Sequence, residues 1–131
     1  MIAPAPPPAA VEAARPALVL TGRTTEGRRV VVEVRAGAVR AVRVGVLRYR
    51  CGRYGDVGPV VVSVQGRAPV GRDRRFHLRA GPSAERLAFD GRLGGSGRAV
   101  AGSLRLTGTI ATGEPCRSRR IAFRAAAQAP S

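Results

Sequence analysis

The sequence predicts an all-β protein, folded as a single antiparallel β-sandwich or small closed barrel of about eight strands. Apolar and polar residues alternate in short runs along most of the chain. Glycine and proline separate these runs at short, regular intervals. The apolar residues are rich in valine, which favours strands, and no stretch shows the apolar period of an amphipathic helix.

The first two runs predict two strands, each with one apolar face. The first run is ALVLTGRTT at residues 17–25, and the second is GRRVVVEVRAG at residues 27–37. In the second run Glu33 and Arg35 fall on the outer face. The predicted inward residues of the two runs are Leu18, Leu20, Gly22, Thr24, Val30, Val32 and Val34.

The third run, AVRAVRVGVLRYRC at residues 38–51, is long and changes phase. Val42, Val44 and Val46 face inward at even positions, and the apolar residues then fall at the odd positions Leu47, Tyr49 and Cys51. A phase change of one residue is typical of a β-bulge, because the side-chain period of a strand is two. We expect this bulge near Gly45.

Five further runs complete the predicted sheet. They are GPVVVSVQG (58–66), RRFHLRAG (74–81), RLAFDGRLGG (86–95), RAVAGSLRLTGTI (98–110) and RSRRIAFRA (117–125). Their predicted inward residues include Phe76, Leu78, Leu87, Phe89, Leu93, Val100, Leu104, Leu106, Ile121 and Phe123. The glycine-rich segment 91–102 joins two of these strands and predicts a hairpin loop, since a phosphate-binding loop opens a helix and carries a lysine.

These runs lie within residues 17–125, which we expect to form one β-domain. Residues 1–16, MIAPAPPPAAVEAARP, predict a disordered Pro/Ala-rich lead or linker, and residues 126–131 predict a disordered tail. The lead lacks the basic start and apolar stretch of a signal peptide. It fits a cytosolic protein with a loose tail, or a linker that follows a signal encoded further upstream. We favour the linker.

The charge is strongly unbalanced. The 131 residues include 23 basic residues, all of them arginine, and 8 acidic ones, which gives a formal net charge of +15. The excess of Arg, Ala, Gly, Pro and Val is typical of a GC-rich genome, which accounts for arginine in place of lysine but not for the scarcity of acids. A field of this size attracts nucleic acid, acidic cell-wall polymers or anionic lipid. The alternative is a solvated basic surface without a specific partner.

The chain contains two cysteines, Cys51 and Cys116, each at the boundary of a predicted strand. Two cysteines are the number that one disulfide needs, and a disulfide implies an oxidising compartment. The alternative is two free thiols in a reducing cytosol. Two cysteines and the single histidine do not make an ordinary zinc site, so we expect no metal and no cofactor.

A disulfide would bring together the arginines that flank the two cysteines, because it places their Cα atoms within about 7 Å. Such a basic patch could bind phosphate or carboxylate groups. The alternative is a solvated outer face. The candidate binding residues are Arg48, Arg50, Arg53, Arg117, Arg119, Arg120 and Arg124.

No catalytic arrangement stands out in the sequence. His77 lies between two inward residues and therefore points to the outer face. The serines and aspartates show no nucleophile motif, and no pair of carboxylates points to glycoside cleavage. We therefore expect a protein that is not an enzyme.

Several segments resemble a family of small exported two-cysteine β-domains of unknown function from GC-rich bacteria. The matching segments are LTGRTTEGRRVVVEV, GAVRAVRVGVLRYRC, FDGRL, AGSLRL and a late C…IAFRA. The resemblance implies a secreted domain with a Cys51–Cys116 bridge, and it implies no known activity. Phe123 occupies the position where such domains usually carry tryptophan.

Together these observations predict a non-enzymatic β-domain, secreted or held at the cell envelope, that binds anionic polymers through an arginine-rich face. The alternative is a cytosolic small β-barrel that binds nucleic acid. A small apolar ligand inside a barrel is disfavoured, because a chain this short fills its interior with Val and Leu. No run is long enough for a transmembrane helix.

Overall fold

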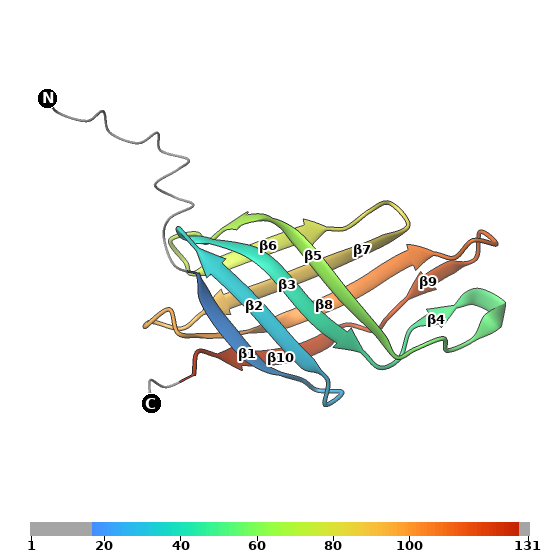
Figure 1. Ribbon diagram of the computed structural model, residues 1–131, viewed down its shortest axis with the longest axis horizontal. Helices are drawn as coiled ribbons and strands as arrows, with labels where there is room; N and C mark the ends of the chain where they lie inside the picture. Colours follow the sequence, from blue (N-terminus) through green and yellow to red (C-terminus); the bar gives the residue numbers. More distant parts are fainter. Residues whose placement is uncertain (1–16, 129–131) are drawn as a thin grey trace, which may run out of the picture.

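The computed structural model describes residues 17–128 and confirms the all-β class (Figure 1). In this part of the chain, ten strands form one antiparallel sheet, and a single 3-10 turn is the only helical element. The elements are β1 (Leu18–Thr24), β2 (Arg29–Arg35), β3 (Ala38–Val46), β4 (Arg50–Cys51), η1 (Gly52–Tyr54), β5 (Val60–Pro69), β6 (Arg75–Ala80), β7 (Glu85–Leu93), β8 (Ala99–Thr109), β9 (Pro115–Arg117) and β10 (Ile121–Ala126).

The main strands follow the order β5-β3-β2-β1-β10-β8-β7-β6. Strands β1 and β10, the first and last within residues 17–128, pair with each other in the middle of this sheet. Gly22 of β1 lies opposite Ala125 of β10, and a Cβ at Gly22 would collide with the carbonyl oxygen of Arg124. The close approach of the two strands therefore requires glycine at this position.

The prediction of a closed sandwich or barrel is wrong, because the sheet is a curled half-barrel that stays open between β5 and β6. In Figure 1, β1, β2, β3 and β5 cross in front of β6, β7 and β8. The two edge strands meet through side chains rather than through a backbone ladder. A Cβ at Gly66 of β5 would lie 3.1 Å from Leu78 Cδ1 of β6.

The inner face of the curled sheet is a continuous apolar core, and nearly all of the predicted inward residues are buried or half-buried in it. Valines dominate β2, β3 and β5, whereas leucines and phenylalanines dominate β6, β7, β8 and β10. Phe89 stacks on Phe123 with ring centroids 4.3 Å apart, and on Phe76 with centroids 6.0 Å apart. This stack joins β6, β7 and β10 at the centre of the core.

The predicted bulge near Gly45 is wrong. Strand β3 ends at Val46, and the phase change falls in the irregular stretch between β3 and β4. Gly45 pairs in regular register with Val61, and its missing side chain leaves space for Arg28, whose Cβ would lie 3.1 Å from a Cβ at Gly45. The register of β3 against β5 shifts instead between Val39 and Ala41.

The last strand continues into the predicted tail as far as Ala126. The backbone N–H of Ala127 donates to the carbonyl oxygen of Arg98 (2.8 Å), and the guanidinium of Arg98 donates to the carbonyl oxygen of Gln128 (3.2 Å). The predicted lead, residues 1–16, and the end of the predicted tail, residues 129–131, lie outside the described residues. Between residues 17 and 128, no helix has the length and apolar character to cross a bilayer.

Candidate functional site

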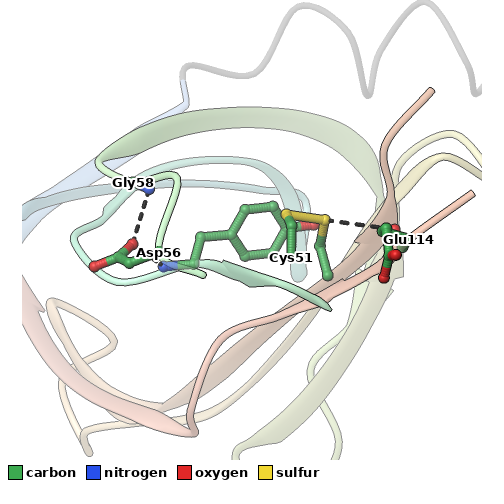
Figure 2. The surroundings of a disulfide bond; sticks show 6 residues. Cys51, Asp56, Gly58 and Glu114 are labelled. Atoms are coloured by element: carbon green, nitrogen blue, oxygen red, sulfur yellow. Dashed lines mark hydrogen bonds between the residues drawn. A yellow bond between two sulfur atoms is a disulfide. The ribbon is translucent and has the colours of Figure 1, made fainter. Parts of the chain in front are cut away.

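The two cysteines pair as predicted. Cys51 of β4 lies directly opposite Cys116 of β9, with sulfur atoms 2.03 Å and Cα atoms 4.0 Å apart. Figure 2 shows the disulfide bond, and both of its residues are buried. Strand β9 also pairs with β8, so the disulfide fastens the short strand β4 onto the main sheet. A half-cystine carries no proton, so the 3.8 Å approach of Cys116 Sγ to the carbonyl oxygen of Glu114 is a contact and not a hydrogen bond.

The loop after β4 is held by Asp56. Its Oδ1 accepts backbone N–H groups from Tyr49 (3.1 Å) and Gly58 (2.9 Å), the second of which is drawn in Figure 2. These two N–H donors, aided by the nearby charges of Arg48 and Arg50, hold the pKa of Asp56 below its ordinary value against a smaller opposing effect of desolvation. Asp56 is therefore ionised at neutral pH and fixes the loop beside β4.

Beside this loop lies a groove of about 580 Å³, here called the cysteine groove. Its lining comes from the stretch before β4, from β4 and β9, from the chain that follows β9, and from β8. The lining residues are Arg48, Arg50, Asp56, Arg105, Arg117, Ser118 and Arg119. Five cations therefore face one carboxylate in a single concavity.

Ser118 fixes the shape of the groove where the chain passes from β9 to β10. This residue is buried, its Oγ accepts the backbone N–H of Leu106 (2.9 Å), and its hydroxyl donates to the carbonyl oxygen of Arg119 (2.8 Å). Its own N–H donates to the carbonyl oxygen of Leu106 (2.8 Å). These bonds keep the flanking arginines on the outer face while the chain changes from β9 to β10.

The five guanidinium groups of the cysteine groove are free to bind a ligand. Within residues 17–128, none of them forms an ion pair or a side-chain hydrogen bond. Arg50 and Arg117 are directly opposed on neighbouring strands. Like charges in this position repel, so an anion between them would relieve the repulsion.

The structure gathers four of the predicted binding residues, Arg48, Arg50, Arg117 and Arg119, in the cysteine groove. The other three predicted residues lie elsewhere. Arg53 pairs with Glu114 (Nε to Oε1, 3.4 Å) and lies over the ring of Tyr54, 5.3 Å from its centroid. Arg120 lines a smaller hollow beside Asp90 and Arg79, and Arg124 lies opposite Arg23 on the pair β1–β10.

Arg105 is the groove arginine that the sequence did not single out. It lies on β8 between the buried Leu104 and Leu106, so the alternation of the sequence already places it on the outer face. The missing information was the pairing of β8 with β9, which brings Arg105 into the same groove as Arg117 and Arg119.

His77 forms a surface cluster with an acid and an arginine. Its Nδ1 lies 2.8 Å from Asp90 Oδ1, and Arg79 donates to the same oxygen at 2.7 Å. Burial raises the pKa of Asp90, but the hydrogen bonds from Arg79 and His77 outweigh it and lower the pKa overall. Ser103 lies opposite Asp90 on β8, away from His77 on β6. The histidine therefore does not reach this hydroxyl, as activation of a nucleophile requires.

No metal-binding group of three or more His, Cys, Asp or Glu side chains occurs in the part of the chain that the structure describes. Comparison of the chain with protein-family models, with curated proteins and with solved structures yields no match. The resemblance to exported two-cysteine domains therefore stays a prediction.

Proposed function

We propose that this protein is an exported, non-enzymatic β-domain that binds anionic polymers of the cell envelope in the cysteine groove. The observation that carries the proposal is the set of five exposed arginines around one concavity, with a single carboxylate whose hydrogen bonds go to the backbone. Guanidinium groups bind phosphate and carboxylate through paired N–H donors. A polymer with repeated anionic groups engages several of them at once.

The disulfide supports a site outside the cytosol. Structural disulfides persist in oxidising compartments and are rare in reducing ones. In this protein the disulfide also positions half of the groove, since Arg48 and Arg50 belong to the segment that it fastens to β9. The proposed binding and the proposed location therefore depend on the same bond.

The proposal is tested by calorimetric titration of the oxidised protein with purified poly(glycerol phosphate), at about 0.15 M salt where long-range attraction is screened. The test variant is Arg50→Thr/Arg117→Thr. It removes two cations from the groove, and threonine is a residue that favours β-strands. The control is Arg43→Thr/Arg67→Thr, which removes the same charge from exposed positions on β3 and β5. We expect the test variant to lose at least about tenfold in affinity and the control to lose much less.

Three results would overturn the proposal. The first is no binding of poly(glycerol phosphate) at this salt concentration, and the second is equal losses in the two double variants, which would show attraction by net charge alone. The third is binding of single-stranded DNA or RNA much tighter than binding of the envelope polymer. That result would favour the alternative of a nucleic-acid-binding protein, with affinity falling steeply as salt rises.

A further inference from the structure

A second set of arginines forms a line across the outer face of the sheet. The register places one residue from each of six neighbouring strands side by side, from β6 through β7, β8, β10 and β1 to β2. In this order the residues are Arg75, Arg92, Ala101, Arg124, Arg23 and Arg29. The five arginines of this line are here called the arginine row.

All five arginines of the row are exposed, and their neighbours within the strands are buried or face the core. Neighbouring strands lie about 4.8 Å apart, so the row runs for about 24 Å across the sheet, at right angles to the strands. No single strand contains this pattern, because each contributes one residue. The row is therefore a product of the register and is invisible along the sequence.

The charges of the row are not balanced by acids. Among residues 17–128, none of the five arginines forms an ion pair, and Arg23 alone has a side-chain hydrogen bond, to the carbonyl oxygen of Gly27 (2.9 Å). The acids closest in register are already engaged. Asp90 binds Arg79 and His77, and Asp73 accepts the backbone N–H of Arg75.

Three steps of the row place arginine directly opposite arginine: Arg75 with Arg92, Arg124 with Arg23, and Arg23 with Arg29. Directly opposed like charges destabilise a sheet. A ligand that carries a line of negative charges would convert this repulsion into attraction. A small anion would reach only neighbouring arginines and leave the others unbalanced.

The row is interrupted at Ala101, and the surface at this position suits a chain-like ligand. Ala101 separates Arg92 from Arg124, and a shallow groove of about 690 Å³ lies over this position. The alanines Ala99, Ala101 and Ala126 contribute to its lining. Short side chains at this point let a polymer pass close to the sheet between the two guanidinium groups.

We propose that the arginine row is a second binding site, which takes one extended phosphate polymer lying across the strands. The proposal shares its ligand class with the proposed function but none of its residues. Ala101 of the row and Arg105 of the cysteine groove are four positions apart on β8, a distance of about 14 Å along a strand. The two sites can therefore be tested separately.

The test uses long-chain inorganic polyphosphate as the probe and tripolyphosphate as the short comparison. The variant is Ala101→Glu, which places a carboxylate between Arg92 and Arg124. We expect this variant to unfold at the same temperature as the native protein or higher, because it relieves repulsion. We also expect it to bind long-chain polyphosphate at least about tenfold more weakly, with a shallower dependence on salt. The control is Ser63→Glu, which adds the same charge on β5, a strand that contributes no residue to the row.

The native protein should bind long-chain polyphosphate much more tightly than tripolyphosphate. The proposal is overturned if the two probes bind equally, if the native protein binds neither, or if Ala101→Glu binds the long chain no more weakly than Ser63→Glu does. A preserved unfolding temperature excludes misfolding as the cause of a loss.

The double variant Arg50→Thr/Arg117→Thr separates this proposal from the proposed function. If it alone loses binding of long-chain polyphosphate, the row is overturned and the cysteine groove stands. If Ala101→Glu alone loses binding, the row stands and the cysteine groove loses its support. Losses in both variants support both sites, and losses in neither overturn both.

Discussion

Arg50 and Arg117 lie directly opposite each other on β4 and β9, in the register position next to the disulfide. Arg50 precedes Cys51 in the chain and Arg117 follows Cys116, so the bond that pairs the cysteines also pairs the arginines. Two like charges in this position lower the stability of the sheet. The covalent bond holds them together in spite of this repulsion, which is the arrangement expected of a site prepared for an anion.

Loss of the disulfide is expected to cost both stability and binding. The two cysteines are 65 positions apart, and in the chain-entropy model a loop of this length contributes about 4 kcal/mol. Cys51→Ser/Cys116→Ser should therefore unfold at a lower urea concentration than the native protein. Binding of poly(glycerol phosphate) should weaken as well, because β4 is released from β9. Reduction of the native protein is the matched control, and unchanged binding after reduction would contradict the expectation.

Charge reversal at Arg117 is expected to move stability and binding in opposite directions. Arg117→Glu places a carboxylate opposite Arg50, and a cross-strand pair of opposite charge contributes about 0.2–1 kcal/mol at an exposed position. The gain should be visible in urea unfolding at low salt and should shrink as salt rises. Affinity for the envelope polymer should fall. Arg67→Glu on β5 serves as the control, and a variant less stable than this control would contradict the account of the opposed arginines.

Stability at acid pH is expected to depend on Asp56. Its pKa in the folded protein is lower than its ordinary value of 3.8, so the ionised carboxylate stabilises the fold above about pH 4. This contribution is lost as the pH falls through the ordinary value and then through the lowered one. Asp56→Asn keeps an oxygen for the N–H groups of Tyr49 and Gly58 but does not titrate. Urea unfolding of the native protein and the variant should therefore converge as the pH falls below about 4, and parallel curves would refute the assignment.

The phenylalanine stack is expected to carry a large share of the core stability. Phe89 is fully buried and contacts the rings of Phe76 and Phe123. Phe89→Ala should cost about 3–5 kcal/mol through lost burial and an unfilled cavity. Calorimetry or urea unfolding measures the loss, and Phe89→Leu should recover part of it. A cost below about 1 kcal/mol would show that the packing of β6, β7 and β10 does not depend on this stack.

The strands and their inner faces could be predicted from the sequence because alternation is a local signal. Leu20, Val32, Leu78 and Leu104 are buried as their parity indicates. The open edge between β5 and β6 could not be predicted. Whether these two edge strands pair depends on the curvature of the whole sheet and not on the sequence of any one strand. The prediction of a bulge near Gly45 is wrong for a related reason. A shift of the apolar residues from even to odd positions gives the same sequence pattern whether the strand contains a bulge or ends there.

The candidate site could be predicted only in part. The disulfide implied that the arginines next to the cysteines are neighbours, and Arg50 and Arg117 confirm this. For arginines further from the cysteines, the separation in sequence does not show whether they lie in the cysteine groove. Arg120 and Arg124 belong to the same predicted run, residues 117–125, but Arg124 lies in the arginine row. Arg105 joins the cysteine groove because β8 pairs with β9, and nothing in the sequence indicates this pairing.

Binding in the cysteine groove is tested most directly by titrating the oxidised, isotope-labelled protein with poly(glycerol phosphate) at about 0.15 M salt. The NMR signals of the backbone amides and of the arginine Nε–H groups report which residues contact the polymer. We expect saturable shifts that concentrate on the arginines of the cysteine groove, namely Arg48, Arg50, Arg105, Arg117 and Arg119. Small shifts that spread evenly over all arginines and do not saturate would contradict it, because they would show a basic surface without a built site.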